Sequence, residues 1–65
     1  MMLDTFKIKL IMAEKEMDIA EMAKRCEITR QNLGRVINHG SCRPKTAGIL
    51  ARALGVDVRE IVKEA

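Results

Sequence analysis

The stretch ITRQNLGRVI, residues 28–37, decides the fold of this chain. Thr29 can accept a hydrogen bond from an otherwise unpaired N–H of a first helical turn, so we expect it to begin a helix that runs to about Asn38. The apolar residues of this stretch then share one face at helical spacing, which is typical of a helix anchored to a core. They are Leu33, Val36 and Ile37.

The opposite face of this predicted helix carries Arg30, Gln31 and Arg35. Arg can bond guanine through two hydrogen bonds, Gln can do the same with adenine, and the major groove of DNA is wide enough to admit a helix. These three side chains are therefore candidates for reading base edges. The alternative for any one of them is an ordinary solvated helix surface.

Positive charge is concentrated around the same helix. The net charge of the 65 residues is +3, and no Asp or Glu occurs between Ile28 and Val56. That interval holds Arg30, Arg35, Arg43, Lys45 and Arg52, together with the one histidine, His39. A segregated positive field favours a polyanion on one face of the protein.

The remaining sequence predicts an all-α fold of five short helices. They span residues 5–15, 19–25, 29–38 and 46–54, followed by a last helix after Asp57. Their predicted N-caps are Asp4, Asp18, Thr29, Thr46 and Asp57. Gly55 ends the fourth helix, because glycine takes the left-handed conformation at little cost.

Apolar side chains at helical spacing supply the expected core. The first helix offers Phe6, Ile8, Leu10, Ile11 and Met12, and the second offers Ile19, Met22, Ala23 and Cys26. The fourth offers Ile49, Leu50, Ala53 and Leu54, and the last offers Ile61 and Val62.

A very short connection at Glu27-Ile28 joins the second and third helices. This spacing is that of a helix-turn-helix, in which the first helix crosses the DNA backbone and the second enters the major groove. Residues 39–44, HGSCRP, form a loop, because glycine relaxes the backbone and Pro44 disfavours a helical Arg43.

Several other classes of protein are not expected. The apolar run at the start of the chain is too short for a signal peptide or a spanning helix, so we expect a cytoplasmic protein without a membrane partner, and reduced cysteines. A single histidine and the lack of a Gly-rich phosphate loop argue against an enzyme, and no cofactor is expected. Cys26, His39 and Cys42 could form a metal or redox site, but their spacing matches no zinc pattern and a fourth ligand is missing.

Four segments carry a resemblance to a known family: MDIAEMA at 17–23, ITRQ at 28–31, RP at 43–44 and ARALGV at 51–56. In order and spacing they resemble the Cro and phage-repressor (XRE-like) helix-turn-helix domain, over about Ile8 to Val62. The resemblance implies a compact five-helix, lambda-repressor-like domain. It also implies binding of pseudo-palindromic operators in double-stranded DNA as a homodimer.

The resemblance also implies roles for single residues. The helix that begins at Thr29 becomes the recognition helix, with base contacts from Arg30, Gln31 and Arg35 and with Asn32 near phosphates or bases. Lys45 matches a position from which some relatives reach toward the minor groove. Asn38 and Arg43 match positions that approach the phosphate backbone.

Three positions depart from the family pattern. Ile19 stands where relatives commonly have a Gln that bonds a phosphate, and it cannot make that bond. Glu27 stands where relatives usually have Gly, and a left-handed Glu would cost roughly 1 kcal/mol. Met12 and Ile37 stand where some relatives pair an Arg with a Glu, so a hydrophobic contact is expected to replace an ion pair.

The expected function is that of a sequence-specific transcriptional regulator, most simply a repressor, formed by one domain over residues 1–65. The resemblance implies a dimer contact from Val58, Glu60 and Ile61, and a place in the core of its own chain is an equal alternative for Ile61. The alternative is a protein-interaction module, such as an antitoxin that binds a partner toxin. Antitoxins usually carry an extra segment for the toxin, and we expect none beyond Ala65.

Overall fold

The computed structural model describes residues 1–63, and the regular structure of this part of the chain is helical, with two isolated antiparallel bridges. Its elements are α1 (Thr5–Glu14), α2 (Ile19–Cys26), α3 (Arg30–His39), α4 (Pro44–Leu54) and a 3-10 turn, η1 (Val58–Glu60). The predicted all-α fold is confirmed. Residues 64–65 of the predicted domain lie outside the described residues.

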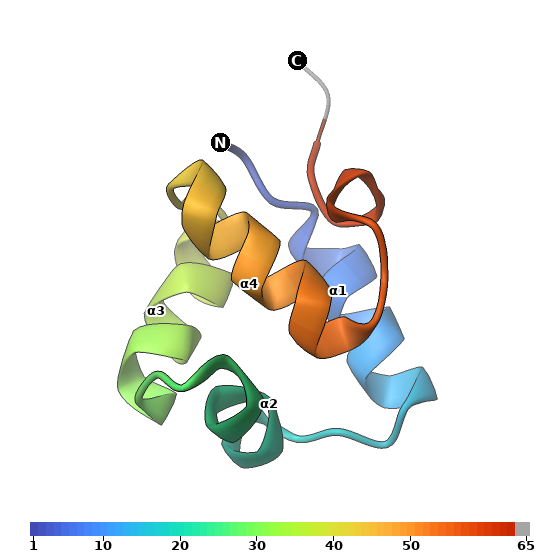
Figure 1. Ribbon diagram of the computed structural model, residues 1–65, viewed down its shortest axis with the longest axis vertical. Coiled ribbons are helices and arrows are strands. Elements are labelled where there is room, and N and C mark those ends of the chain that lie inside the picture. Colours follow the sequence, from blue (N-terminus) through green and yellow to red (C-terminus); the bar gives the residue numbers. More distant parts are fainter. Residues whose placement is uncertain (64–65) are drawn as a thin grey trace.

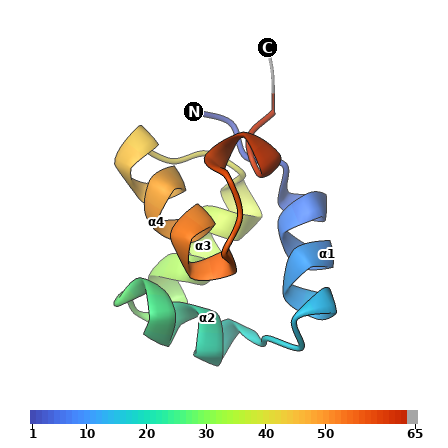
Figure 2. The same cartoon turned by 45° about the vertical axis from the view of Figure 1, so that its right-hand side comes forward.

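The helices surround one core (Figures 1 and 2). α1 and α3 lie on opposite sides of the molecule, and α4 crosses between them. α2 closes the end away from the two chain ends, and it packs on both α3 and α4. The core side chains with almost no exposure are Leu3, Ile8, Met22, Leu33, Leu50, Leu54 and Ile61.

Local hydrogen bonds start the first three helices where the sequence predicts them. The Asp4 carboxylate accepts from the Lys7 N–H at 3.1 Å, and the Asp18 carboxylate accepts from the Glu21 N–H at 2.8 Å. The Thr29 hydroxyl accepts from the Asn32 N–H at 3.0 Å. Each bond satisfies an N–H that has no partner within the helix.

Two predicted boundaries are wrong. α4 begins at Pro44, so Thr46 lies inside the helix and does not cap it. Proline fits the first helical position because its φ is preset and it needs no N–H partner. The last helix is only the 3-10 turn η1, capped by Asp57, because Leu3 then pairs with Val62 in a bridge that requires an extended chain.

Some apolar residues predicted to face the core do not. Ile19 and Ile49 keep 36% and 37% of their surface exposed, and Phe6 and Leu10 of α1 keep 71% and 52%. The helical repeat of α1 explains the last two, since Ile8 and Met12 already fill its inner face.

The N-terminal segment, for which the sequence makes no prediction, closes the core. The N–H of Leu3 donates to the Gly40 carbonyl at 2.8 Å, and the N–H of Asp4 donates to the Ile61 carbonyl at 2.8 Å. The N–H of Lys63 donates to the Met2 carbonyl at 2.9 Å. These bonds hold the segment between the α3–α4 loop and the end of the described chain, and they bury Leu3.

The turn between α2 and α3 sets how the two helices cross. Glu27 adopts the left-handed conformation, with φ 57° and ψ 40°. Its N–H donates to the Lys24 carbonyl at 3.2 Å, and the next N–H, of Ile28, donates to Ala23 at 3.1 Å. Glu27 thus occupies, with a Cβ, the left-handed conformation that glycine adopts at less cost.

We predict that Glu27→Gly stabilises the protein. A left-handed residue with a Cβ costs roughly 1 kcal/mol, and glycine removes that cost. The free energy of unfolding in urea should rise by up to about 1 kcal/mol, reduced by the greater freedom of glycine in the unfolded chain. The matched control Lys24→Gly, in the regular part of α2, should lower it by about 1 kcal/mol. Equal destabilisation by both substitutions would contradict the strain at Glu27.

Candidate nucleic-acid interface

The core holds α3 by one face. Leu33 is fully buried, Ile37 is 4% exposed, and Val36 packs against them at the edge of the core. Because these residues recur at helical spacing, the rest of the helix must face outward. The sequence prediction of an anchored helix is thus confirmed in the orientation of α3.

The outer face of α3 is polar and exposed. It presents Arg30, Gln31, Asn32, Arg35 and Asn38, and the side chain of Thr29 stands exposed at its first turn. Among residues 1–63 the ion pairs join Lys7 to Glu60, Arg25 to Glu21 and Arg59 to Asp57, so none involves α3. The cations of α3 are therefore available to an external anion.

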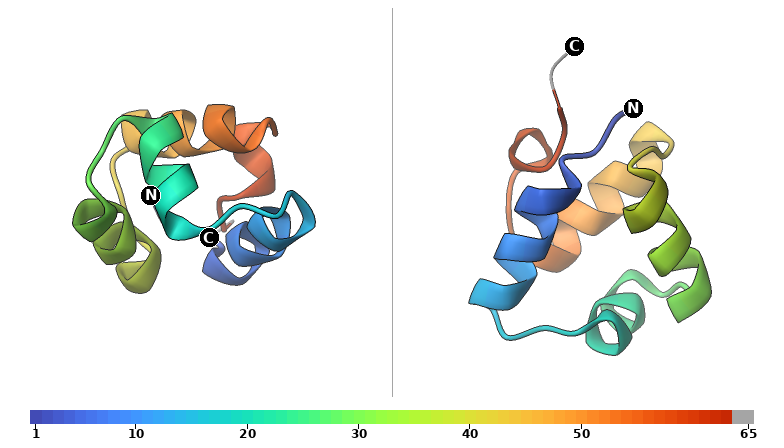
Figure 3. Two further views of the ribbon diagram at one scale, coloured as in Figure 1. Left: turned by 90° about the horizontal axis from the view of Figure 1, so that it is seen from below. Right: turned by 180° about the vertical axis from the view of Figure 1, so that it is seen from behind.

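The other predicted contact residues lie at the start of α4. Arg43 is the N-cap residue of α4 without a side-chain capping bond, and Lys45 lies in its first turn. Both are exposed. The view from behind in Figure 3 shows the loop that leads from the end of α3 to the start of α4.

A basic groove lies between the end of α2 and α4, and the sequence did not reveal it. It has a volume of about 610 Å³ and an apolar wall that includes Ile49. Its charged residues are Arg25, Lys45, Arg52 and one acid, Glu27. Glu27 lies in the turn before α3, so the groove extends the positively charged surface beyond α3. Only the packing of α2 on α4 brings Arg25 to Lys45.

At the start of α2, Ile19 replaces the Gln that is common in the family pattern, and Asp18 caps the helix. Ile19 is the first residue of α2 and offers no polar group. The carboxylate of Asp18 already bonds the free N–H of Glu21 at this helix end. A negative charge there disfavours a phosphate at the same place.

Met12 and Ile37, the pair expected to replace an ion pair, are both buried and line one shallow groove of about 290 Å³. Met17 and Ile19 line it too. The apolar character of this region is therefore continuous from α1 to α3.

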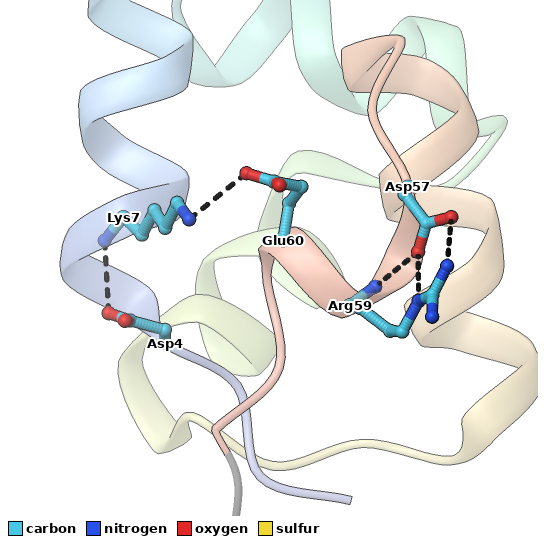
Figure 4. A network of polar contacts seen from close by, with 5 residues as sticks. All are labelled: Asp4, Lys7, Asp57, Arg59 and Glu60. Atoms are coloured by element: carbon cyan, nitrogen blue, oxygen red, sulfur yellow. Dashed lines mark hydrogen bonds and ion pairs between the residues drawn. The ribbon is translucent and has the colours of Figure 1, made fainter.

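The three residues predicted for a dimer contact differ in how much of each side chain is exposed. Val58 is half-buried, and Glu60 is exposed but lies 3.0 Å from the ammonium group of Lys7 (Figure 4). Ile61 has no exposed surface, because it is part of the core of its own chain. The prediction for Ile61 is wrong, since its side chain has no surface left for a second copy.

The two cysteines are free thiols. Cys26 is buried, as the sequence predicts for a small apolar residue, and burial raises the pKa of its thiol. Burial also raises the pKa of the Cys42 thiol, which favours the neutral form of both groups at neutral pH. Within residues 1–63 no three His, Cys, Asp or Glu side chains are grouped to hold a metal ion.

Comparison with known proteins agrees with this geometry. The family described as Cro/C1-type HTH DNA-binding domain matches residues 7–63. Neither the curated proteins nor the solved structures gave a match. No helix of the described residues has the length and apolarity needed to cross a membrane. The matched interval contains α2, α3 and the turn between them, and the chain belongs to the family of Cro/C1-type helix-turn-helix DNA-binding domains.

Proposed function

We propose that this DNA-binding domain, residues 1–65, is a sequence-specific transcriptional repressor that acts in the cytoplasm. The observation that carries the proposal is the outer face of α3, on which Arg30, Gln31 and Arg35 are exposed and free of acidic partners among residues 1–63. Membership of a DNA-binding family supports it.

Each contact residue has a distinct role in the proposal. Arg30, Gln31 and Arg35 bond base edges in the major groove, where such side chains discriminate between base pairs. Asn32 lies at the boundary between base and phosphate contacts. Thr29, Asn38 and Arg43 approach the backbone, which fixes the register of α3 in the groove, and Lys45 reaches toward the minor groove.

Two copies bind a pseudo-palindromic operator, with their α3 helices in successive major grooves roughly 34 Å apart. The contact between these copies is assigned to the exposed parts of Val58 and Glu60. Repression follows from occupancy of a promoter, which needs no surface beyond the DNA-binding one. Binding-site selection from a random duplex library tests this proposal, because a two-fold symmetric motif is the expected result. A library without enrichment would contradict it.

Base reading by α3 is tested with Gln31→Ala and Arg35→Ala. Each variant should lose about 1–3 kcal/mol of binding free energy at the selected operator and little on random duplex DNA. The control is Lys63→Ala, which removes a cation near the chain ends and should leave the ratio of the two affinities unchanged. Equal losses on operator and random DNA would remove the claim of sequence specificity.

The role of Lys45 is tested by the salt dependence of binding. A cation that contacts a phosphate releases a counterion, so Lys45→Ala should weaken binding to all sequences and lower the slope of log K against log salt by about one unit. Lys45→Arg, which keeps the charge, should retain the slope. An unchanged slope in Lys45→Ala would place this side chain away from DNA.

A further inference from the structure

One edge of the N-terminal segment, residues 1–3, holds the loop that joins α3 to α4. The N–H of Leu3 donates to the Gly40 carbonyl at 2.8 Å, and the Met1 carbonyl accepts from the N–H of Cys42 at 3.0 Å. The nitrogen of Met1 in turn donates to the Cys42 carbonyl at 3.1 Å. Within the described chain, no other backbone hydrogen bond ties this loop to a distant segment.

The other edge of the N-terminal segment is anchored to the end of the described chain. The N–H of Lys63 donates to the Met2 carbonyl at 2.9 Å. The two segments run side by side in Figure 1, where they are blue and red. The side chain of Leu3, which is 1% exposed, is buried in the core. The N-terminal segment is therefore fixed by the core and by a second segment, and the loop is fixed to it.

Gly40 shows how closely the N-terminal segment and the loop approach each other. A Cβ at this position would lie 3.3 Å from Cγ2 of Thr5 and 3.7 Å from the carbonyl oxygen of Leu3. The φ of Gly40, 69°, is left-handed, so the chain leaves α3 at this residue. The course of the loop beyond it is therefore set by the N-terminal segment and not by α3 alone.

The loop carries Arg43, whose side chain is held by nothing in the described chain. It is exposed, it makes no capping bond to α4, and it belongs to none of the ion pairs of residues 1–63. Its backbone is extended, with φ −71° and ψ 153°, as expected before Pro44. The preceding residue, Cys42, is the one that exchanges hydrogen bonds with Met1. The direction in which Arg43 leaves the loop therefore depends on that pairing.

We propose that residues 1–3 are a positioning segment for Arg43, which order the loop before DNA binds and direct the guanidinium group toward a phosphate. The phosphate contact rests on the proposed function, whereas the ordering of the loop does not. Fixing the backbone of a residue costs conformational entropy, and a contact is stronger when its groups are already ordered. The segment raises affinity through Arg43 and not through a DNA contact of its own.

Replacement of single amides by esters tests the proposal, because an ester oxygen cannot donate a hydrogen bond and every side chain stays in place. With 65 residues, the full chain is within reach of chemical synthesis. The test ester replaces the N–H of Cys42, which removes its 3.0 Å bond to Met1. The matched control ester replaces the N–H of Lys63, which removes the 2.9 Å bond to Met2 on the other edge.

NMR relaxation of the free protein gives a result that does not depend on DNA. The N–H order parameter of Arg43 should fall in the Cys42 ester and stay near the ~0.85 of a rigid backbone in the Lys63 ester. An Arg43 that is equally ordered in both esters would overturn the proposal, because the loop would then keep its shape without the N-terminal segment.

DNA affinity gives the second result. The Cys42 ester should bind at least ~threefold more weakly, which is part of the roughly tenfold that a hydrogen bond to a charged group is worth. The factor should be the same on operator and random duplex DNA, since a phosphate contact carries no sequence information. The Lys63 ester should bind like the unmodified chain. Equal losses in both esters would assign the effect to lower stability and overturn the proposal.

A double-mutant cycle assigns the loss to one side chain. In an Arg43→Ala chain the Cys42 ester should cause no further loss, because the contact that it misplaces is already absent. In a Gln31→Ala chain the full loss should remain, since the core holds α3. A loss that persists in Arg43→Ala would overturn the proposal.

Failure of the proposed function and failure of this inference are distinguishable. If the unmodified chain binds no DNA, the proposed function is wrong, and the order parameter of Arg43 in the two esters still decides whether residues 1–3 order the loop. If the unmodified chain binds its operator and the Cys42 ester binds equally well, only the inference is wrong.

Discussion

The burial of one face of α3 is the constraint on which the rest of the structure depends. Leu33 and Ile37 fill the centre of a core that also holds Leu50 and Leu54. Removing a side chain of this kind from a core costs roughly 2–5 kcal/mol, which is a large share of the stability of a small domain. The helix therefore cannot rotate about its axis without losing the fold, and its polar face has a fixed direction toward the solvent.

The turn before α3 fixes the other degree of freedom, the angle at which α3 leaves α2. The left-handed Glu27 ends α2 so that α3 can begin at Arg30, and the fold retains this conformation in spite of its cost. The same residue stands beside the basic groove formed by Arg25, Lys45 and Arg52. One acid at this position lowers the positive charge of the surface without pairing with α3.

The two sides of the molecule thus differ in chemistry. The outer face of α3 is polar and basic, whereas α1 leaves the large apolar side chains of Phe6 and Leu10 exposed. Ile8 and Met12 of α1 face the core, and the helical repeat then turns Phe6 and Leu10 outward.

What the sequence by itself determined was local in origin. The caps at Asp4, Asp18 and Thr29 and the two faces of α3 depend on hydrogen bonds or side chains within one or two helical turns, so spacing was sufficient to predict them. The exposure of Arg30, Gln31 and Arg35 followed from the same periodicity, whereas the roles of Asn32, Asn38, Arg43 and Lys45 came from the family resemblance.

The tertiary structure decided everything that depends on contacts between distant segments. The N-terminal residues form backbone hydrogen bonds with residues 40–42 and 61–63. These contacts bury Ile61 and limit the last helix to a single turn. The packing of α2 on α4 brought Arg25 to Lys45. The tertiary structure also decided which apolar residues of α1 reach the core. A helical repeat shows which residues share a face, but only the neighbouring helices determine which face is covered.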